Sequence, residues 1–298
     1  MAQYWTHLVR FIAEEDGQVH LGQVDSTQFP DVGLAMLNGE KVTVKEIKGS
    51  VFDGVVQNRV QNVSQPISME DFPLIRCMGL NYRDHALEAN MPIPDVPVLF
   101  IKPRTALNGP QPARINVPKI AQDGTSDYVA DLSIIMSKTE KDIPEKDAMD
   151  YVLGYTSSND VSARTQQWKN SQWSIAKGFD FSCPIGPILL APSAIKDPHQ
   201  LAIKAIHNGN IVQGSNTQEM IFTIPQIISF LSQGTTLEKG TIIMTGTGPG
   251  IGAMRDPRVV LNHGDEIRVE IERLVLWLTQ STMNKEPICR VLSLSSIL

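Results

Sequence analysis

The amino-acid sequence predicts a β-rich α+β protein in which strands outnumber helices. Between residues 128 and 280 most segments have the length and apolar pattern of strands, among them YVADLSIIM, YVLGYTSSNDVS and DEIRVEIERLVLWL. Only PEKDAMDYV and TIPQIISFLSQG have the pattern of helices. Because strands and helices do not alternate regularly, a β-roll or sandwich with a few helices is favoured over a doubly wound sheet.

The N-terminal segment is predicted to form short strands and turns. LVRFIA, QVHLGQV and KVTVKEI have β character, and Asn38-Gly39 is typical of a hairpin turn. We therefore expect a small β domain over residues 1–68, with QPISMEDFP as a linker. The main domain covers residues 69–282 and contains a second hairpin turn at Asn208-Gly209. The tail from 283 to 298 does not continue the strand rhythm and is predicted to be an appendage.

Within the main domain, local signals place the remaining elements. IRCMGL is a short buried strand that leads into the polar helix start NYRDHALEAN. The Pro-rich stretch MPIPDVPVLFIKP can form only loop and edge strand. The first predicted helix, PEKDAMDYV, has Pro in its first turn. The second has Thr223 as its N-cap, and Gly234 ends it.

Bulk properties exclude several classes of protein. The 298 residues are 42% hydrophobic with a net charge of −6, enough for a sizeable core and without a basic nucleic-acid footprint. No apolar run is long enough to cross a bilayer, and the N-terminus does not resemble a signal peptide. The 3 cysteines form neither a disulfide framework nor a zinc motif. We expect a cytoplasmic protein that contacts neither membranes nor nucleic acid.

His85 and Glu88 are the first candidate pair for chemistry. They are three residues apart in NYRDHALEAN, so on a helix they share one face. A carboxylate beside an imidazole fixes its tautomer and raises its basicity, which makes a general base. The alternative is an exposed helical pair without a role.

Two acids near strand ends are the candidate metal ligands. Asp131 lies among apolar residues in DYVADL, and Asp160 follows the strand VLGYTSS. Both could share a hard cation such as Mg²⁺, or they could simply cap turns. Val129 shares a strand face with Asp131, so a carboxylate at 129 would complete a pair, but the residue is valine.

Cations and a glycine turn complete the candidate residues. Lys177, in AKGFDFSCPIGP, could hold a substrate carboxylate or stabilise an enolate, or it is a solvated loop lysine. Arg164 and Gln167 could grip an acidic substrate. TGTGPGIG is neither a P-loop nor a dinucleotide fingerprint, and is predicted to line a pocket with backbone N–H groups or Thr247.

Seven motifs, in the order in which they occur, resemble the fumarylacetoacetate hydrolase family, in its branch of fumarylacetoacetate hydrolase domain-containing proteins. These motifs are GLNYRDHALE, PVLFIKP, DYVADLSIIM, YVLGYTSSNDVSAR, AKGFDFSCPIGP, NGNIVQGSNTQEMIF and TGTGPGIG. The resemblance runs from about residue 5 to about residue 274. It implies a small N-terminal β domain, a larger domain of mixed β-rolls, and a homodimer. It also implies hydrolysis, decarboxylation or tautomerisation of 1,3-dicarbonyl or 2-oxo acid substrates.

The resemblance also implies roles for individual residues. His85 and Glu88 match the family pair that activates water or moves a proton. Lys177 matches the active-site lysine, and Asp160 the third metal ligand. The positions that match substrate contacts are Tyr82, Arg164, Gln167 and Thr247.

The metal ligands depart from the family pattern. That pattern is Asp-Tyr-Glu-x-Glu-Leu, with both glutamates on Mg²⁺ or Mn²⁺, whereas this chain has Val129 and Asp131. Asp127 cannot replace the lost ligand, because four residues of strand separate it from Asp131 by roughly 13 Å. We therefore expect weak or absent binding of Mg²⁺ or Mn²⁺.

Three functional hypotheses remain open. The first is an enzyme that acts through the His-Glu pair without a metal, as a tautomerase, decarboxylase or cyclase in secondary-metabolite biosynthesis. The second is a Mg²⁺-dependent C–C hydrolase or an oxaloacetate decarboxylase or tautomerase. The third is a catalytically inactive homologue that binds a ligand.

Overall fold

The computed structural model describes residues 5–66, 72–110 and 112–283, and it confirms the β-rich fold class. A ten-stranded sheet runs through the molecule. Its strands, in spatial order, are β2 (Val19–Val24), β3 (Thr43–Lys48), β4 (Val55–Pro66), β1 (His7–Ala13), β15 (Ile188–Leu190), β12 (Val152–Asn159), β10 (Ala130–Met136), β19 (Ile242–Met244), β5 (Ile75–Gly79) and β6 (Val98–Lys102).

A second, five-stranded sheet packs against the central strands of the first. It consists of β17 (Asn210–Asn216), β16 (Ala202–His207), β20 (Glu266–Ile271), β21 (Leu274–Met283) and β8 (Arg114–Val117). Three two-stranded sheets pair β11 (Glu140–Lys141) with β18 (Thr236–Leu237), β13 (Ser162–Ala163) with β9 (Ser126–Asp127), and β14 (Cys183–Pro184) with β7 (Leu107–Asn108).

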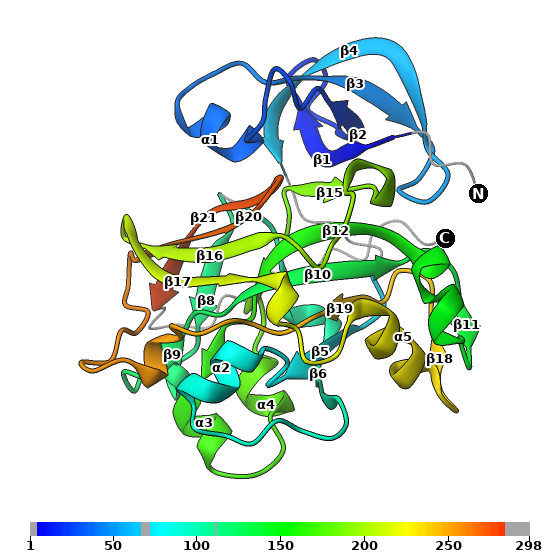
Figure 1. Ribbon diagram of the computed structural model, residues 1–298. Helices are drawn as coiled ribbons and strands as arrows, with labels where there is room; N and C mark the ends of the chain where they lie inside the picture. Colours follow the sequence, from blue (N-terminus) through cyan, green and yellow to red (C-terminus); the bar gives the residue numbers. More distant parts are fainter. Residues whose placement is uncertain (1–4, 67–71, 111, 284–298) are drawn as a thin grey trace, which may run out of the picture.

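The helices are short and few among the described residues. The α-helices are α1 (Val32–Leu37), α2 (Arg83–Glu88), α3 (Arg164–Trp168), α4 (Ser174–Lys177) and α5 (Ile224–Ser232). Short 3-10 helices are η1 (Arg104–Ala106), η2 (Lys119–Ala121), η3 (Glu145–Tyr151), η4 (Pro192–Ala194), η5 (Thr217–Glu219) and η6 (Gly252–Met254). In Figure 1, α2, α3 and α4 gather at one end of the molecule, opposite β1 to β4 and α1.

The two faces of strand β10 pack against different parts of the protein. All seven of its residues are buried. Leu132 and Ile134 belong to the core shared with the five-stranded sheet, whereas Ile135 belongs to a second core on the other face. Since side chains alternate along a strand, Asp131 points to the same side as Ile135.

Of four predictions made from local sequence signals, two are confirmed, one differs in the type of helix and one is wrong. Helix α5 is confirmed, and the Thr223 N–H donates to the Gln226 side chain at 2.9 Å at its start. Asn208 and Gly209 both have positive φ in the two-residue hairpin loop between β16 and β17, as predicted. PEKDAMDYV instead forms the 3-10 helix η3. The hairpin prediction at Asn38-Gly39 is wrong, because this pair ends helix α1.

The domain boundaries stay a prediction. Strand β4 ends at Pro66, and the linker residues 67–71 lie outside the described residues, as does the tail from 284 onward. Strand β1 pairs with β15, so strands of both predicted domains contribute to one continuous sheet. Among the described residues, every helix is too short or too polar to traverse a lipid bilayer.

Candidate active site

One cavity gathers nearly all the residues singled out from the sequence. It has a volume of about 230 Å³ and lies where α2, α3 and α4 meet the ends of β5 and β10 and the turn after β19. The predicted residues that line it are His85, Val129, Asp131, Asp160, Arg164, Gln167, Lys177 and Thr247. Residues from segments far apart in the sequence therefore converge on one site.

Asp131 is the buried acid of this cavity. Its side chain is 2% exposed, and its Oδ1 has no hydrogen-bond partner among the described residues. Burial, with the nearby Asp160 carboxylate as the next cause, raises the pKa of Asp131 well above its usual value. Val129 lines the same cavity and offers only methyl groups beside this carboxyl.

Asp160 is held by two lysines. Its Oδ2 accepts from the Lys177 Nζ at 2.5 Å, and its Oδ1 lies 2.9 Å from the Lys102 Nζ. Burial alone would raise the pKa of Asp160, but Lys102 and Lys177 hold it below its usual value. Because both carboxylate oxygens face ammonium groups, Asp160 serves here as an anchor for cations.

Lys177 keeps one donor for a ligand. An ammonium has three N–H donors, and Lys177 donates two of them, to Asp160 and to the Ser162 Oγ at 2.7 Å. Burial lowers the pKa of Lys177, although the Asp160 charge opposes this effect. The predicted alternative, a solvated loop lysine, is wrong, because the residue is only 4% exposed.

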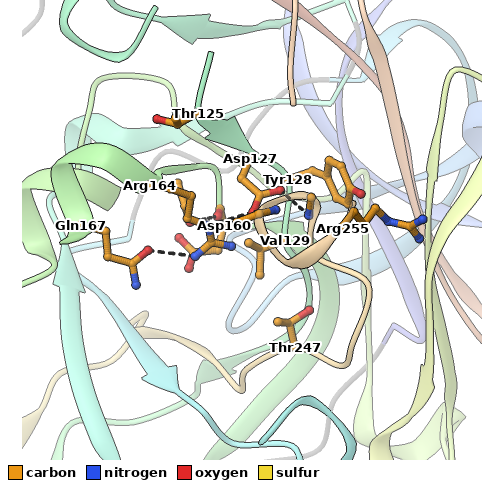
Figure 2. A network of polar contacts seen from close by, with 12 residues as sticks. Thr125, Asp127, Tyr128, Val129, Asp160, Arg164, Gln167, Thr247 and Arg255 are labelled. Carbon is orange, nitrogen blue, oxygen red and sulfur yellow. Dashed lines mark hydrogen bonds and ion pairs between the residues drawn. The ribbon is translucent and has the colours of Figure 1, made fainter. Parts of the chain in front are cut away.

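Arg164 is fixed by a network that Figure 2 shows. Its Nε donates to Asp127 Oδ2 at 2.8 Å, and its Nη1 donates to Gln167 Oε1 at 2.9 Å. Asp127 in turn accepts from the backbone N–H groups of Gly252 and Ala253, at 2.8 and 3.1 Å. The remaining Nη2 is buried and has no partner among the described residues, so it is available to an anionic ligand.

His85 and Glu88 form a hydrogen-bonded pair on α2. The His85 Nδ1 lies 2.9 Å from Glu88 Oε2, and Glu88 Oε1 accepts from the Gly250 N–H at 2.7 Å. The backbone at Gly250 thus orients Glu88, and Glu88 in turn orients His85. Burial lowers the pKa of His85, and the hydrogen bond to Glu88 opposes this effect only in part. Burial therefore favours the neutral form of His85.

Two predicted contact residues, Thr247 and Tyr82, have surroundings that differ from this expectation. The Thr247 hydroxyl donates to the Ala130 carbonyl at 2.6 Å and accepts from the Gln213 side chain at 2.9 Å, which leaves it no further proton to donate. Tyr82 starts helix α2, but its side chain is fully buried and is absent from the cavity lining. The structure does not place Tyr82 where a ligand in this cavity would touch it.

The comparisons with known proteins identify the family. A family model described as fumarylacetoacetate (FAA) hydrolase C-terminal matches residues 74–279. The chain belongs to the fumarylacetoacetate hydrolase family. Among its relatives, caffeoylpyruvate hydrolase of Neonothopanus nambi is 41% identical over 96% of this chain and 95% of that protein. The mitochondrial oxaloacetate tautomerase fahd2 of Xenopus laevis is 44% identical over 67% of this chain and 62% of that protein.

Solved structures agree with this assignment. The crystal structure of 2-hydroxyhepta-2,4-diene-1,7-dioate isomerase from Mycobacterium marinum has a TM-score of 0.77 and 27% identity, and the match covers 94% of this chain and 100% of that one. The resemblance drawn from the seven motifs is therefore confirmed. Family relatives are hydrolases, isomerases and tautomerases, and this protein is an enzyme of the same family.

The residues present do not fit a tightly held metal ion, although family members often use Mg²⁺ or Mn²⁺. Val129 has no donor atom, and both oxygens of Asp160 face lysines. Only Asp131 then offers an uncommitted carboxylate oxygen. Within the described ranges, no group of three or more His, Cys, Asp or Glu side chains is arranged to hold a metal.

Several residues of the site escaped the sequence analysis. Lys102 was hidden because a lysine in the apolar strand VLFIKP gives no sign of its partner, Asp160, which lies far along the chain. Phe100, Trp168 and Trp173 line the cavity as well. Trp168 is four residues from Arg164, and Trp173 is four residues from Lys177. This spacing is the sequence signal that could have indicated the two tryptophans.

Proposed function

We propose that this enzyme acts on a 2-oxo acid or 1,3-dicarbonyl acid, with His85 moving the proton and with cations binding the substrate's oxygens. The observation that carries the proposal is the oriented His85–Glu88 pair on the same cavity as the unpaired Nη2 of Arg164. The printed names of relatives support the substrate class, since they include a caffeoylpyruvate hydrolase and an oxaloacetate tautomerase.

The proton-transfer role follows from the tautomer of His85. A carboxylate only accepts hydrogen bonds, so Glu88 requires the proton of neutral His85 on Nδ1. Nε2 is then the free base. It can take a proton from the carbon between the two carbonyls, and return it to the enolate from the same position. Both half-steps leave Glu88 ionised.

The cations match the charges of such a substrate. The Arg164 Nη2 would bind the carboxylate, because a buried guanidinium nitrogen without a partner gains most from an anion. The third N–H of Lys177 would donate to the oxygen on which enolate charge develops. Asp160 keeps Lys177 in place, and its negative charge opposes the lowering of the lysine's pKa by burial.

The proposed reaction does not depend on a metal. A site that lacks the donor at Val129 suits tautomerisation, decarboxylation or cyclisation, which need a base and oxyanion donors. A role in secondary-metabolite biosynthesis is a prediction that rests on this altered ligand set alone. The homodimer and the cytoplasmic location are likewise predictions.

A second candidate is hydrolysis of the C–C bond of an acylpyruvate. It is favoured by the relative that matches along almost the whole chain, the Neonothopanus nambi caffeoylpyruvate hydrolase. Here the His85 Nε2 would remove a proton from water, whose oxygen attacks the acyl carbonyl. The C–C bond then breaks, the enolate of pyruvate leaves towards Lys177 and Arg164, and a proton adds to its carbon.

The experiment compares two substrates in the purified protein with and without EDTA. Oxaloacetate reports tautomerisation and acetylpyruvate reports hydrolysis, each followed by loss of enol absorbance. We expect one of the two to be converted with a rate that EDTA leaves unchanged, and His85→Gln to lower kcat by roughly 10²–10⁴-fold. His20→Gln, on β2 and outside the cavity lining, is the matched control.

The outcomes separate the hypotheses. Complete loss of activity in EDTA, restored by Mg²⁺, would support the metal-dependent alternative. Wild-type rates in His85→Gln would remove the proton-transfer role. No conversion of either substrate would refute the proposed function and favour an inactive binding homologue.

A further inference from the structure

We propose that the apolar side of the cavity is a binding site for a planar aromatic acyl arm, so that the preferred substrate is an aroyl-type 2,4-dioxo acid. This inference rests on the proposed function. The residues concerned, here called the aromatic wall, are Met78, Met91, Phe100, Trp168, Trp173 and Met254, all of which line the cavity.

The two tryptophans stand one helical turn from the two cations of the site. Arg164 and Trp168 are four residues apart at the ends of α3, and Trp173 and Lys177 are four apart at α4. Residues with this spacing share one face of a helix. Each of the two adjacent helices therefore presents one cation and one indole ring to the same cavity.

The inner part of the aromatic wall is rigid. Phe100 and Trp173 form an edge-to-face pair with ring centroids 5.8 Å apart and an interplanar angle of 60°. Trp173 also lies against the backbone of Gly79, where a Cβ would come within 2.5 Å of its ring. A preformed pair of this kind binds a flat ring with little loss of side-chain entropy.

The outer part of the wall is exposed in the free protein. Trp168 is 52% exposed, and Met91 and Met254 are 48% and 45% exposed. The Arg258 guanidinium lies 5.2 Å from the centre of the Trp168 ring and fixes one face of it. An apolar ligand arm would remove this surface from water, and the flexible methionines can adapt to its edges.

The wall begins directly beside the reacting groups. The Lys177 Nζ lies 4.8 Å from the centre of the Phe100 ring. A substrate whose enolate oxygen meets Lys177 would therefore place the next atoms of its chain against Phe100. A ring held on a long spacer would pass beyond Phe100 and Trp173, the preformed part of the wall. The arm that fits is one whose ring is joined to the carbonyl directly or by a short conjugated link.

The test uses three substrates with the same 2,4-dioxo acid head: acetylpyruvate, benzoylpyruvate, and an alkanoylpyruvate with six arm carbons. We expect kcat/KM for benzoylpyruvate to exceed that for each of the others by roughly fivefold to tenfold. Trp168→Ala should abolish this preference through KM, and Trp168→Phe should keep most of it. Phe230→Ala truncates an exposed aromatic side chain on α5, outside the cavity lining, and is the control.

Each outcome decides the matter. If acetylpyruvate is converted as well as benzoylpyruvate, the aromatic site is refuted while the proposed function stands. If the alkanoyl arm is as good as the aryl arm, the wall is merely apolar and the inference is wrong. If Trp168→Ala lowers kcat/KM equally for all substrates and changes the mass in sedimentation, Trp168 belongs to a subunit contact. Conversion of none of the three would overturn this inference, and oxaloacetate as a fourth substrate then shows whether the proposed function stands.

Discussion

Replacing Val129 and Asp131 together by glutamate is expected to raise the affinity for Mg²⁺ by roughly 30-fold to 1,000-fold. A unit charge about 4 Å from another is worth about 4 kcal/mol at an effective dielectric constant of about 20, and a divalent ion doubles this. Val129 is only 4% exposed, so the new carboxylate loses its hydration, which offsets several kcal/mol. The net gain is about 2–4 kcal/mol, which gives the stated range.

Isothermal titration calorimetry of the natural protein and the double variant measures this change directly. Val129→Gln/Asp131→Glu supplies the control, since it has the same length and one charge fewer, and should gain less than a tenth as much affinity. Micromolar binding of Mg²⁺ by the natural protein would refute the reasoning about Val129. Unchanged weak binding in the double variant would show that the lysines on Asp160, rather than the missing ligand, prevent metal binding.

Three further predictions follow from the same geometry. Because burial lowers the pKa of His85 below 6.5 and the neutral form is the base, kcat/KM should be full at pH 7 and fall only as the pH drops below 6.5. Lys102→Met removes one partner of a buried ion pair and should lower the free energy of unfolding in urea by about 3–5 kcal/mol. Gly79→Ala should displace Trp173, shift its fluorescence emission and weaken benzoylpyruvate binding.

Each of these has a matched control and a contrary result. Lys141→Met breaks only an exposed pair and should change the stability by less than about 1 kcal/mol. Gly214→Ala adds a methyl group that meets no atom within 4 Å and should leave the emission unchanged. A kcat/KM profile that already falls at a pH above 6.5 would contradict the lowered pKa of His85. A stability loss equal to that of Lys141→Met would contradict the buried pair of Lys102.

Local signals predicted the parts of the fold whose causes are local. The α5 cap and the Asn208-Gly209 turn depend on a few neighbouring residues, and the structure has both. The same reasoning failed at Asn38-Gly39, because an Asn-Gly pair with positive φ at the glycine suits the end of a helix as well as a hairpin. The residues before it, not the pair itself, decide between these two structures.

The site was predictable where chemistry lies close together in the sequence. His85 and Glu88 are one helical turn apart, and Val129 and Asp131 are two residues apart and line the same cavity, so spacing alone indicated each pair. The contacts of Arg164 were not predictable in this way. Its anchor, Asp127, was considered only as a metal ligand, and the Gly252 and Ala253 N–H groups that hold Asp127 come from far along the chain.

The charges around Asp160 and Arg164 support the proposal that this site binds an oxo acid without a metal. Burial and Asp160 raise the pKa of Asp131, which favours its neutral form. Lys102 and Lys177 share the single carboxylate of Asp160, whereas Arg164 pairs with Asp127. Arg164 Nη2 and the third N–H of Lys177 are without a partner among the described residues, so they are the donors left for an anionic substrate. With valine at position 129 no carboxylate adds negative charge beside Asp131, and the two lysines that share Asp160 favour the developing charge of an enolate.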